Sequence, residues 1–263
     1  MIYINNQEKI NRLNLKENTY YVVADFDQTL TQGNSISTWE VVASASEIGE
    51  EYTKKRKEYY NHYRPMEIDP NLSDEEKAIA MDEWWKKHIN LFYEYNMKEE
   101  SMNNSLCKCE LKYRSGAKEF IRKMHEKNIP IVIISAGIGN VIEYFFKKED
   151  DLYRNMQIIS NFIHFENGII KKMNEKTIHS LNKNIVSMDN NLKETLNNKK
   201  ILLLGDGLGD LKMLGEYNKE NAITVGFLDE KIEENLEVFN KSFDIVITHE
   251  GSFEDVNNIL KIY

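Results

Sequence analysis

Short, strongly apolar runs alternate with longer helix-prone stretches through much of the chain. Ile131–Ile134 and Ile201–Leu204 are uninterrupted apolar runs of strand length, each followed by a turn and a helical pattern. Strands with this pattern are buried on both faces, as in a parallel sheet that helices cover on each side. The sequence therefore predicts an α/β fold with a parallel sheet. The other expected strands are Tyr20–Phe26, Gln157–Ser160, Ala222–Val225 and Phe243–Ile247. Helices are expected at Ala117–Lys127, Ile185–Leu196, Leu208–Tyr217 and Phe253–Ile262, with a hairpin turning at Asn167-Gly168.

One long segment interrupts this alternation. Residues 34–114 contain no convincing strand and are rich in charged, helix-forming residues, with Ser73 and Glu76 at the spacing of a capping box. Because the segment follows the first expected strand, it should lie over the carboxyl end of that strand, where open α/β sheets bind ligands. We expect a helical cap domain at 34–114 and a catalytic core built from 1–33 and 115–263.

Charge and cysteine content narrow the possible partners. The formal net charge is −9, and no basic stripe compensates for it, so a nucleic-acid polymer is not an expected partner. The apolar runs are too short for a membrane span or a signal peptide. A bridge between Cys107 and Cys109, which a single residue separates, would be strained, so we expect reduced thiols. These features predict a cytoplasmic protein whose partner is a small molecule. We also expect a monomer.

Two carboxylates directly follow the first expected strand. Asp25 and Asp27 are separated by one residue at the point where ligands of α/β sheets bind. This placement suits a nucleophilic carboxylate beside an acid/base carboxylate, with a divalent metal between them. A lone Asp-x-Asp is more often a surface turn. The apolar strand before it and the motifs further along the chain favour a site.

A second pair of acids follows the buried run Ile201–Leu204. Asp206 and Asp210 lie among glycines that let the backbone approach a metal or a phosphate closely. The rival interpretation is a dinucleotide-binding fingerprint, which requires glycine at position 210. A carboxylate there would repel a pyrophosphate, so this interpretation is rejected.

Two weaker signals concern phosphate. Ser135-Ala136-Gly137 ends a buried strand before a helix, and a hydroxyl with backbone N–H groups there can cradle a phosphate. The same serine could be an ordinary helix N-cap. Lys183 alone would be read as a solvated surface charge.

In chain order, these four pieces resemble the motifs of the haloacid dehalogenase (HAD) superfamily. The pattern is Asp25-Phe-Asp-Gln-Thr29, then Ser135, then Lys183, then Gly-Asp206 with Asp210. More narrowly, the chain resembles the cytosolic pyrimidine 5′-nucleotidases of the type III group from about residue 21 to the C-terminus. The family-like stretches are Met66–Pro70, Glu83–Lys87, Ser135–Gly139, Ile159–Phe162 and Phe243–Val246. The resemblance implies a Rossmann-like HAD core with a mostly helical cap inserted after the first strand.

The resemblance also implies roles for the motif residues. Asp25 would attack phosphorus, while Asp27 would protonate the leaving alcohol and later activate water. Magnesium would be held by Asp25, the backbone carbonyl of Asp27 and Asp206, with Asp210 supporting them. The phosphoryl oxygens would be held by Ser135, Ala136 and Lys183.

The cap residues are open to more than one interpretation. Glu67 matches a family glutamate that contacts the base or sugar, and His88 stands where the family has a substrate-contacting serine. Trp84 and Trp85 cannot both face the same side of a helix, so at least one should pack inside the cap. The other could stack on a base.

The expected activity is magnesium-dependent hydrolysis of nucleoside 5′-monophosphates, pyrimidine nucleotides preferred, through an aspartyl phosphate. The alternative keeps this chemistry but uses another small phosphomonoester, such as phosphoserine or a sugar phosphate. A signalling receiver domain also places acids, a hydroxyl and a lysine around magnesium. It needs no large helical insert and fits the chain poorly.

Overall fold

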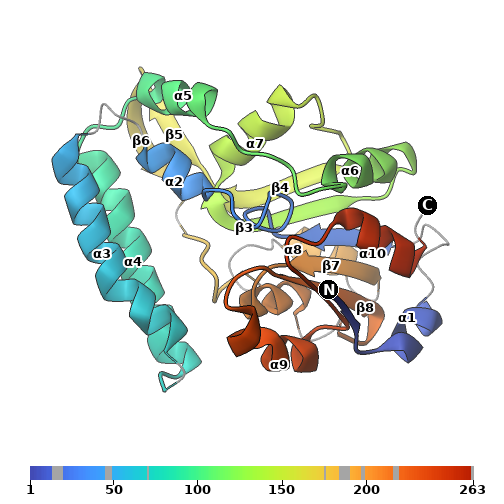
Figure 1. Ribbon diagram of the computed structural model, residues 1–263. Helices are drawn as coiled ribbons and strands as arrows, with labels where there is room; N and C mark the ends of the chain where they lie inside the picture. Colours follow the sequence, from blue (N-terminus) through green and yellow to red (C-terminus); the bar gives the residue numbers. More distant parts are fainter. Residues whose placement is uncertain are drawn as a thin grey trace.

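The computed structural model describes residues 1–13, 20–44, 49–69, 71–174, 176–183, 190–196, 199–215 and 219–261. In these residues a central sheet has the strand order β1-β9-β8-β7-β2-β3-β4 (Figure 1). Every neighbouring pair is parallel except β1 and β9, which are antiparallel. The predicted α/β fold with a parallel sheet is confirmed. The strands are β1 (Ile2–Ile4), β2 (Tyr20–Ala24), β3 (Ile131–Ile138), β4 (Met156–Asn161), β7 (Lys200–Gly205), β8 (Ala222–Leu228) and β9 (Ile245–Thr248).

Helices cover both faces of this sheet. Along β2, Val22 and Ala24 belong to one apolar cluster, whereas Val23 belongs to the cluster on the opposite face. All three are fully buried, as their apolar sequence requires in a doubly covered sheet. The first face carries α1 (Gln7–Leu13), α6 (Ala117–Glu126), α7 (Gly139–Lys148) and α10 (Phe253–Leu260). The second carries α8 (Asn190–Leu196), the 3₁₀ helix Leu208–Leu214 and α9 (Ile232–Ser242), and a short 3₁₀ turn, Lys219–Asn221, precedes β8.

The register of the sheet brings three strand ends together. Ala24, the last residue of β2, pairs with Ile133 of β3 and with Leu204 of β7. The N–H of Asp25 still donates to the carbonyl of Leu204 at 3.0 Å. The residues that follow β2, β3 and β7 therefore emerge at one edge of the sheet, the edge where α/β folds bind ligands.

Four helices separate β2 from α6: α2 (Thr38–Ala43), α3 (Glu50–Ile68), α4 (Asp74–Glu94) and α5 (Glu99–Lys108). The long helices α3 and α4, here called the helical pair, run side by side along one flank of the molecule (Figure 1). The predicted capping box starts α4: the Ser73 hydroxyl accepts from the N–H of Glu76 at 3.2 Å, and the Glu76 carboxylate accepts from the N–H of Ser73 at 2.9 Å. None of the helices in the described ranges combines the length and the apolarity that crossing a bilayer requires.

A separate hairpin lies against the helices of this segment. Its strands are β5 (Ile163–Glu166) and β6 (Ile169–Met173), and the predicted turn at Asn167-Gly168 has positive φ at both residues. That conformation matches the two-residue hairpin turn expected from Asn-Gly. A β-bridge joins Lys98 to Ile169, so the hairpin is tied to the chain between α4 and α5.

Some elements differ from the sequence prediction. Strand β1 was not predicted, because three residues with only Tyr3 partly covered show no usable alternation. The helical segment therefore follows the second strand of the chain, not the first. The helix expected at Leu208–Tyr217 is a 3₁₀ helix that ends at Leu214, where Gly215 turns the chain with a φ of +61°. Residues 185–189 and 216–217, which belong to two of the predicted helices, lie outside the described ranges.

Candidate active site

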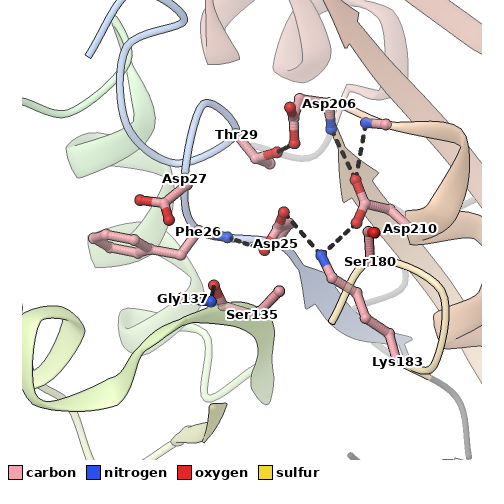
Figure 2. A network of polar contacts seen from close by, with 12 residues as sticks. Asp25, Phe26, Asp27, Thr29, Ser135, Gly137, Ser180, Lys183, Asp206 and Asp210 are labelled. Carbon is pink, nitrogen blue, oxygen red and sulfur yellow. Dashed lines mark hydrogen bonds and ion pairs between the residues drawn. The ribbon is translucent and has the colours of Figure 1, made fainter. Parts of the chain in front are cut away.

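A buried lysine connects two carboxylates at the carboxyl edge of the sheet (Figure 2). Lys183 Nζ lies 2.9 Å from Asp25 Oδ2 and 2.5 Å from Asp210 Oδ1. All three residues are buried, with Lys183 only 3% exposed. Although burial would lower the pKa of Lys183, the negative charges of Asp210 and Asp25 raise it. The lysine is thus held as a cation beside the predicted nucleophile, contrary to the surface position that a lone lysine suggests.

The predicted acidic residues gather at the same place. Asp25, Asp206 and Asp210 place carboxylate oxygens within 4.8 Å of one another. Burial and the charges of Asp210 and Asp25 raise the pKa of Asp206 well above its usual value. Burial also raises the pKa of Asp25, against the lowering effect of Lys183. Three acids facing one lysine leave an excess of negative charge and of hard oxygen ligands, which fits a divalent cation.

Asp210 differs from the other two acids in how fully the protein engages it. Its Oδ2 accepts from the N–H groups of Asp206 at 3.0 Å and Gly207 at 2.9 Å, while Oδ1 faces Lys183. A side chain at position 205 would collide with Asp210, so the glycine permits this close approach. Asp206, by contrast, accepts one hydrogen bond, from Thr29 Oγ1 at 3.3 Å, among the contacts between described side chains. Asp25 lies between the two, because its Oδ1 accepts from the N–H of Phe26 at 2.8 Å and its Oδ2 faces Lys183. Asp206 is therefore the freest of the three carboxylates, with Asp210 holding its surroundings.

Asp27 is oriented by the first residue of α2. Thr38 Oγ1 donates to Asp27 Oδ2 at 2.8 Å, and the N–H of Thr38 donates to Oδ1 at 3.0 Å. Burial raises the pKa of Asp27 to about 7, and the negative charge of Asp25 adds to this effect. A carboxyl group with such a pKa can release and recover a proton near neutral pH. The sequence prediction missed Thr38, whose signal is a helix start close behind Asp27.

Ser135, Ala136 and Gly137, predicted as a turn after the strand, lie within β3, which continues to Ile138 with an irregular register over these residues. Ser135 is buried, and its Oγ accepts from the N–H of Gly137 at 3.0 Å (Figure 2). The carbonyl of Ala136 accepts from Trp39 Nε1 at 2.8 Å and from Asn161 Nδ2 at 2.9 Å. Ser135, Asp25 and Lys183 lie around the same space in the close view, although they come from separate elements.

Glu67, near the end of α3, reaches the segment that carries Lys183. Its Oε1 accepts from Ser180 Oγ at 2.8 Å, and Arg64 holds its other oxygen at 2.5 Å. The same segment meets the helical pair twice more: His179 lies 3.1 Å from Asp82, and Leu181 packs against the apolar interior of the pair. Glu67 is therefore placed on the side of the helical pair that faces the acids and the lysine.

The two tryptophans occupy different positions. Trp84 is buried between α3 and α4 with Tyr63, Ala80 and Met81. Trp85 turns toward the core, with ring centroids 5.7 Å from Trp39 and 6.4 Å from His179. Of the two, Trp85 is the one that contacts Trp39 and His179, next to the carboxyl edge of the sheet.

His88 lies in the same aromatic group and is neutral. Burial lowers its pKa to about 4, and the positive charge of Arg56 adds to this. Its Nε2 and the Nε1 atoms of Trp84 and Trp85 are buried without a hydrogen-bond partner within the described part of the chain. Buried polar atoms normally have partners, and these three nitrogens are exceptions among the described residues.

Comparison with known proteins shows which family the chain belongs to. The family model of pyrimidine 5′-nucleotidase (UMPH-1) matches residues 24–263. The chain belongs to this family. The 7-methylguanosine phosphate-specific 5′-nucleotidase A of Xenopus laevis is 35% identical over 265 residues, which cover 97% of this chain and 91% of the relative. The 7-methylguanosine phosphate-specific 5′-nucleotidase of Homo sapiens is 31% identical over 249 residues, covering 91% and 83%.

Solved structures agree on the fold. Cytosolic 5′-nucleotidase IIIB bound to cytidine superposes with a TM-score of 0.85 at 23% identity, covering 99% of this chain and 93% of that one. A substrate-bound phosphoserine phosphatase gives a TM-score of 0.59 at 16% identity, covering 91% and 97%. The expected HAD fold and the resemblance to cytosolic pyrimidine 5′-nucleotidases are confirmed, and the receiver alternative is wrong. The protein is an enzyme, a phosphatase of the HAD type in a 5′-nucleotidase family.

Proposed function

We propose that the protein hydrolyses nucleoside 5′-monophosphates to nucleoside and inorganic phosphate through a phosphorylated Asp25. One observation carries the proposal. Glu67 of the helical pair is hydrogen-bonded to Ser180, three residues before the lysine that contacts Asp25. The carboxylate of Glu67, which can recognise a base, thus faces the segment of Lys183, which can hold a phosphate. In this proposal residues 34–114 are the cap, and 1–33 with 115–263 are the catalytic core.

The first half-reaction transfers the phosphoryl group to the protein. A carboxylate oxygen of Asp25 forms a bond to phosphorus as the bond from phosphorus to the 5′ oxygen breaks. Asp27 donates its proton to the departing 5′ oxygen, so the nucleoside leaves as an alcohol. The Ser135 hydroxyl, the backbone N–H of Ala136 and Lys183 hold the phosphoryl oxygens and balance the charge that develops on them.

The second half-reaction restores the enzyme. Asp27, now a carboxylate, takes a proton from water as the water oxygen bonds to phosphorus and the bond to Asp25 breaks. Phosphate leaves, and Asp27 again carries its proton. Thr38, which donates to Asp27, keeps the same carboxyl group in place for both proton transfers.

Magnesium is the proposed metal. Asp25, Asp206 and the backbone carbonyl of Asp27 would hold it, with Asp210 fixing their surroundings, and these are the oxygen ligands that magnesium prefers. When bound, the ion neutralises the acids and the phosphate dianion, which would otherwise repel each other.

For the base, we propose that CMP and UMP are used ahead of AMP, and that 7-methyl-GMP belongs with the good substrates. The Glu67 carboxylate can accept from the exocyclic amino group of cytosine. Trp85 offers an aromatic face, which would also attract the positive charge of 7-methylguanine. The proteins named above as 7-methylguanosine phosphate-specific and as bound to cytidine support both choices.

A phosphate-release panel tests the proposal. It contains CMP, UMP, AMP, 7-methyl-GMP, the 3′ isomer of CMP, phosphoserine and p-nitrophenyl phosphate, each with magnesium. We expect the highest kcat/KM for the pyrimidine and 7-methylguanosine 5′-monophosphates and poor use of the 3′ isomer. A clear preference for phosphoserine over every nucleotide would overturn the proposal in favour of the alternative substrate class.

We propose further that the enzyme acts as a monomer in a reducing cytoplasm. Cys107 and Cys109 are unbridged, and the former is exposed. The acids, the lysine and the phosphate turn all come from one chain. Light scattering after size exclusion should give the mass of a single chain, and a stable dimer would contradict this.

A further inference from the structure

The ladder between β3 and β4 is interrupted beside the phosphate-binding turn. Ile134 pairs with Ile159, but the next pair joins Ile138 to Asn161. Residues 135–137 of β3 therefore lie opposite Ser160 alone. A bulge of this kind removes regular ladder partners from the peptide groups within it.

Side chains of β4 take the place of those ladder partners. Asn161 Nδ2 donates to the carbonyl of Ala136 at 2.9 Å, and Ser160 Oγ donates to the carbonyl of Gly137 at 2.9 Å. Asn161 and Ser160 are almost completely buried, at 1% and 2% exposure. Two successive carbonyls of the turn are thus held by two successive residues of the neighbouring strand.

Each held carbonyl fixes the direction of an N–H group. In a planar trans peptide, the carbonyl and the following N–H point in opposite directions. Holding the carbonyl of Ala136 therefore directs the N–H of Gly137, which donates to Ser135 Oγ at 3.0 Å. With its oxygen held in this way, the Ser135 hydroxyl can donate its own proton to a phosphoryl oxygen.

The peptide between Gly137 and Ile138 contacts Thr38 instead of Ser135. Holding the carbonyl of Gly137 directs the N–H of Ile138, which donates to Thr38 Oγ1 at 3.0 Å. Thr38 Oγ1 in turn donates to Asp27 at 2.8 Å. A side chain at position 137 would collide with Thr38, so only glycine allows this approach.

Asn161 also holds the segment that leads to Lys183. Its Oδ1 accepts from the N–H of Ile178 at 2.8 Å, and its Nδ2 donates to the carbonyl of the same residue at 2.9 Å. One buried amide therefore connects the Ser135 turn with the chain that carries the lysine.

We propose that Asn161 and Ser160 are positioning residues with separate tasks. Asn161 orients the Ser135 hydroxyl and the Lys183 segment, which hold the phosphoryl group. Ser160 orients Asp27, through Thr38, for protonation of the leaving oxygen. The inference rests on the proposed function, because it takes the roles of Ser135, Lys183 and Asp27 from there.

Two substitutions separate the tasks. For Asn161→Ala, we expect inhibition by inorganic phosphate to weaken about tenfold or more, the effect of about one buried hydrogen bond. The loss of kcat/KM should be equal on CMP and on p-nitrophenyl phosphate. For Ser160→Ala, phosphate inhibition should stay within about twofold of wild type. Its loss of kcat/KM, which reports only the first half-reaction, should be about tenfold greater on CMP, because nitrophenolate leaves without a proton.

Asn140→Ala is the matched control. Asn140 makes the same kind of two-way amide contact, donating to the carbonyl of Ile163 at 3.0 Å and accepting from its N–H at 2.8 Å. This contact joins the first turn of α7 to the start of β5 and includes none of the hydrogen bonds that hold Ser135, Thr38 or the Lys183 segment. Its loss should lower Tm but leave phosphate inhibition and the ratio of the two substrates unchanged.

Several outcomes would overturn the inference. Phosphate inhibition of Asn161→Ala at the wild-type level is one, and a Ser160→Ala enzyme with equal losses on both substrates is another. Where Asn161→Ala fails to fold, Ser160→Ala, which deletes one oxygen atom, decides by its leaving-group effect. If the wild-type panel favours phosphoserine, the proposed function is wrong but this inference still stands. The leaving-group test of Ser160→Ala would then use phosphoserine in place of CMP, because its departing oxygen also needs a proton.

Discussion

The carboxyl edge of the proposed core and the inner side of the proposed cap are held together by different kinds of contact. At the core edge, Lys183, Asp25 and Asp210 hold one another by charge. In the cap, aromatic rings pack around a neutral His88, and several buried nitrogens have no partner in the described residues. Charged groups that are fixed before the substrate arrives stabilise the transition state, whereas aromatic faces contribute to binding of the base. Changes in the core should therefore lower kcat on any phosphomonoester, and changes in the cap should raise KM for nucleotides alone.

The largest expected effect comes from removing the nucleophile. Asp25→Asn keeps the size of the side chain but leaves no carboxylate to attack phosphorus. Turnover of both CMP and p-nitrophenyl phosphate should fall on the order of 10⁵-fold or more. Phosphate release measures this, and the thermal transition serves as the folding control. Near wild-type release on either substrate would contradict the role of Asp25.

Metal removal should come next in size. Stripping the enzyme with EDTA leaves Asp25, Asp206 and Asp210 without a counterion other than Lys183 among the described contacts. We expect a loss of about 10³-fold, restored by magnesium but poorly by zinc. Full activity in protein shown by elemental analysis to be metal-free would refute the metal assignment.

Asp27→Asn should lower kcat by about 10²- to 10⁴-fold on CMP, because the proton for the leaving oxygen is lost. The loss on p-nitrophenyl phosphate should be smaller in the first half-reaction, since nitrophenolate is a good leaving group. Single-turnover release of nucleoside and of nitrophenolate makes this comparison. Equal losses in that step would argue against Asp27 as the acid.

Glu67→Ala should affect the cap only. We expect KM for CMP to rise about tenfold to a hundredfold, as for the loss of a charged hydrogen bond, with p-nitrophenyl phosphate within about twofold of wild type. Ser180→Ala is the matched control, because it breaks the contact of Glu67 with the core while keeping the carboxylate. Equal losses on both substrates would show that Glu67 serves the core and not the base.

The smallest effect concerns the pH dependence of stability. The pKa of His88 falls from its usual 6.5 to about 4 in the folded protein, so the unfolded chain binds a proton there that the folded protein does not. Stability contributed by neutral His88 is present above about pH 6.5 and is lost as the pH falls toward 4. In His88→Phe, the fall of Tm over this range should be shallower by about 5–10 °C. An unchanged slope in thermal scans would contradict a buried neutral histidine.

The difference between the core edge and the cap also explains which residues could be predicted from the sequence. The acids of the core follow apolar strands, and parallel strands bring their carboxyl ends to one edge, so Asp25 and Asp206 could be placed together from the pattern alone. Thr38 and Asn161 could not, because neutral polar residues are common in turns and at strand ends. Their contacts depend on a bulge that no local pattern marks.

The cap was harder to predict for a related reason. Helical periodicity shows that Trp84 and Trp85 face different sides, but which side packs inward depends on how α3 lies against α4. Strand β1 was missed because its three residues carry too little apolar signal.

Trapping the phosphoenzyme tests most directly whether Asp25 receives the phosphoryl group. Wild-type enzyme with magnesium is mixed with radiolabelled CMP, quenched in acid within the first turnover, and digested for peptide mapping. The expected result is labelled phosphate on the peptide that contains Asp25, and none on the Asp25→Asn protein. Product formation without labelled protein at any time, or label on another residue, would contradict the mechanism.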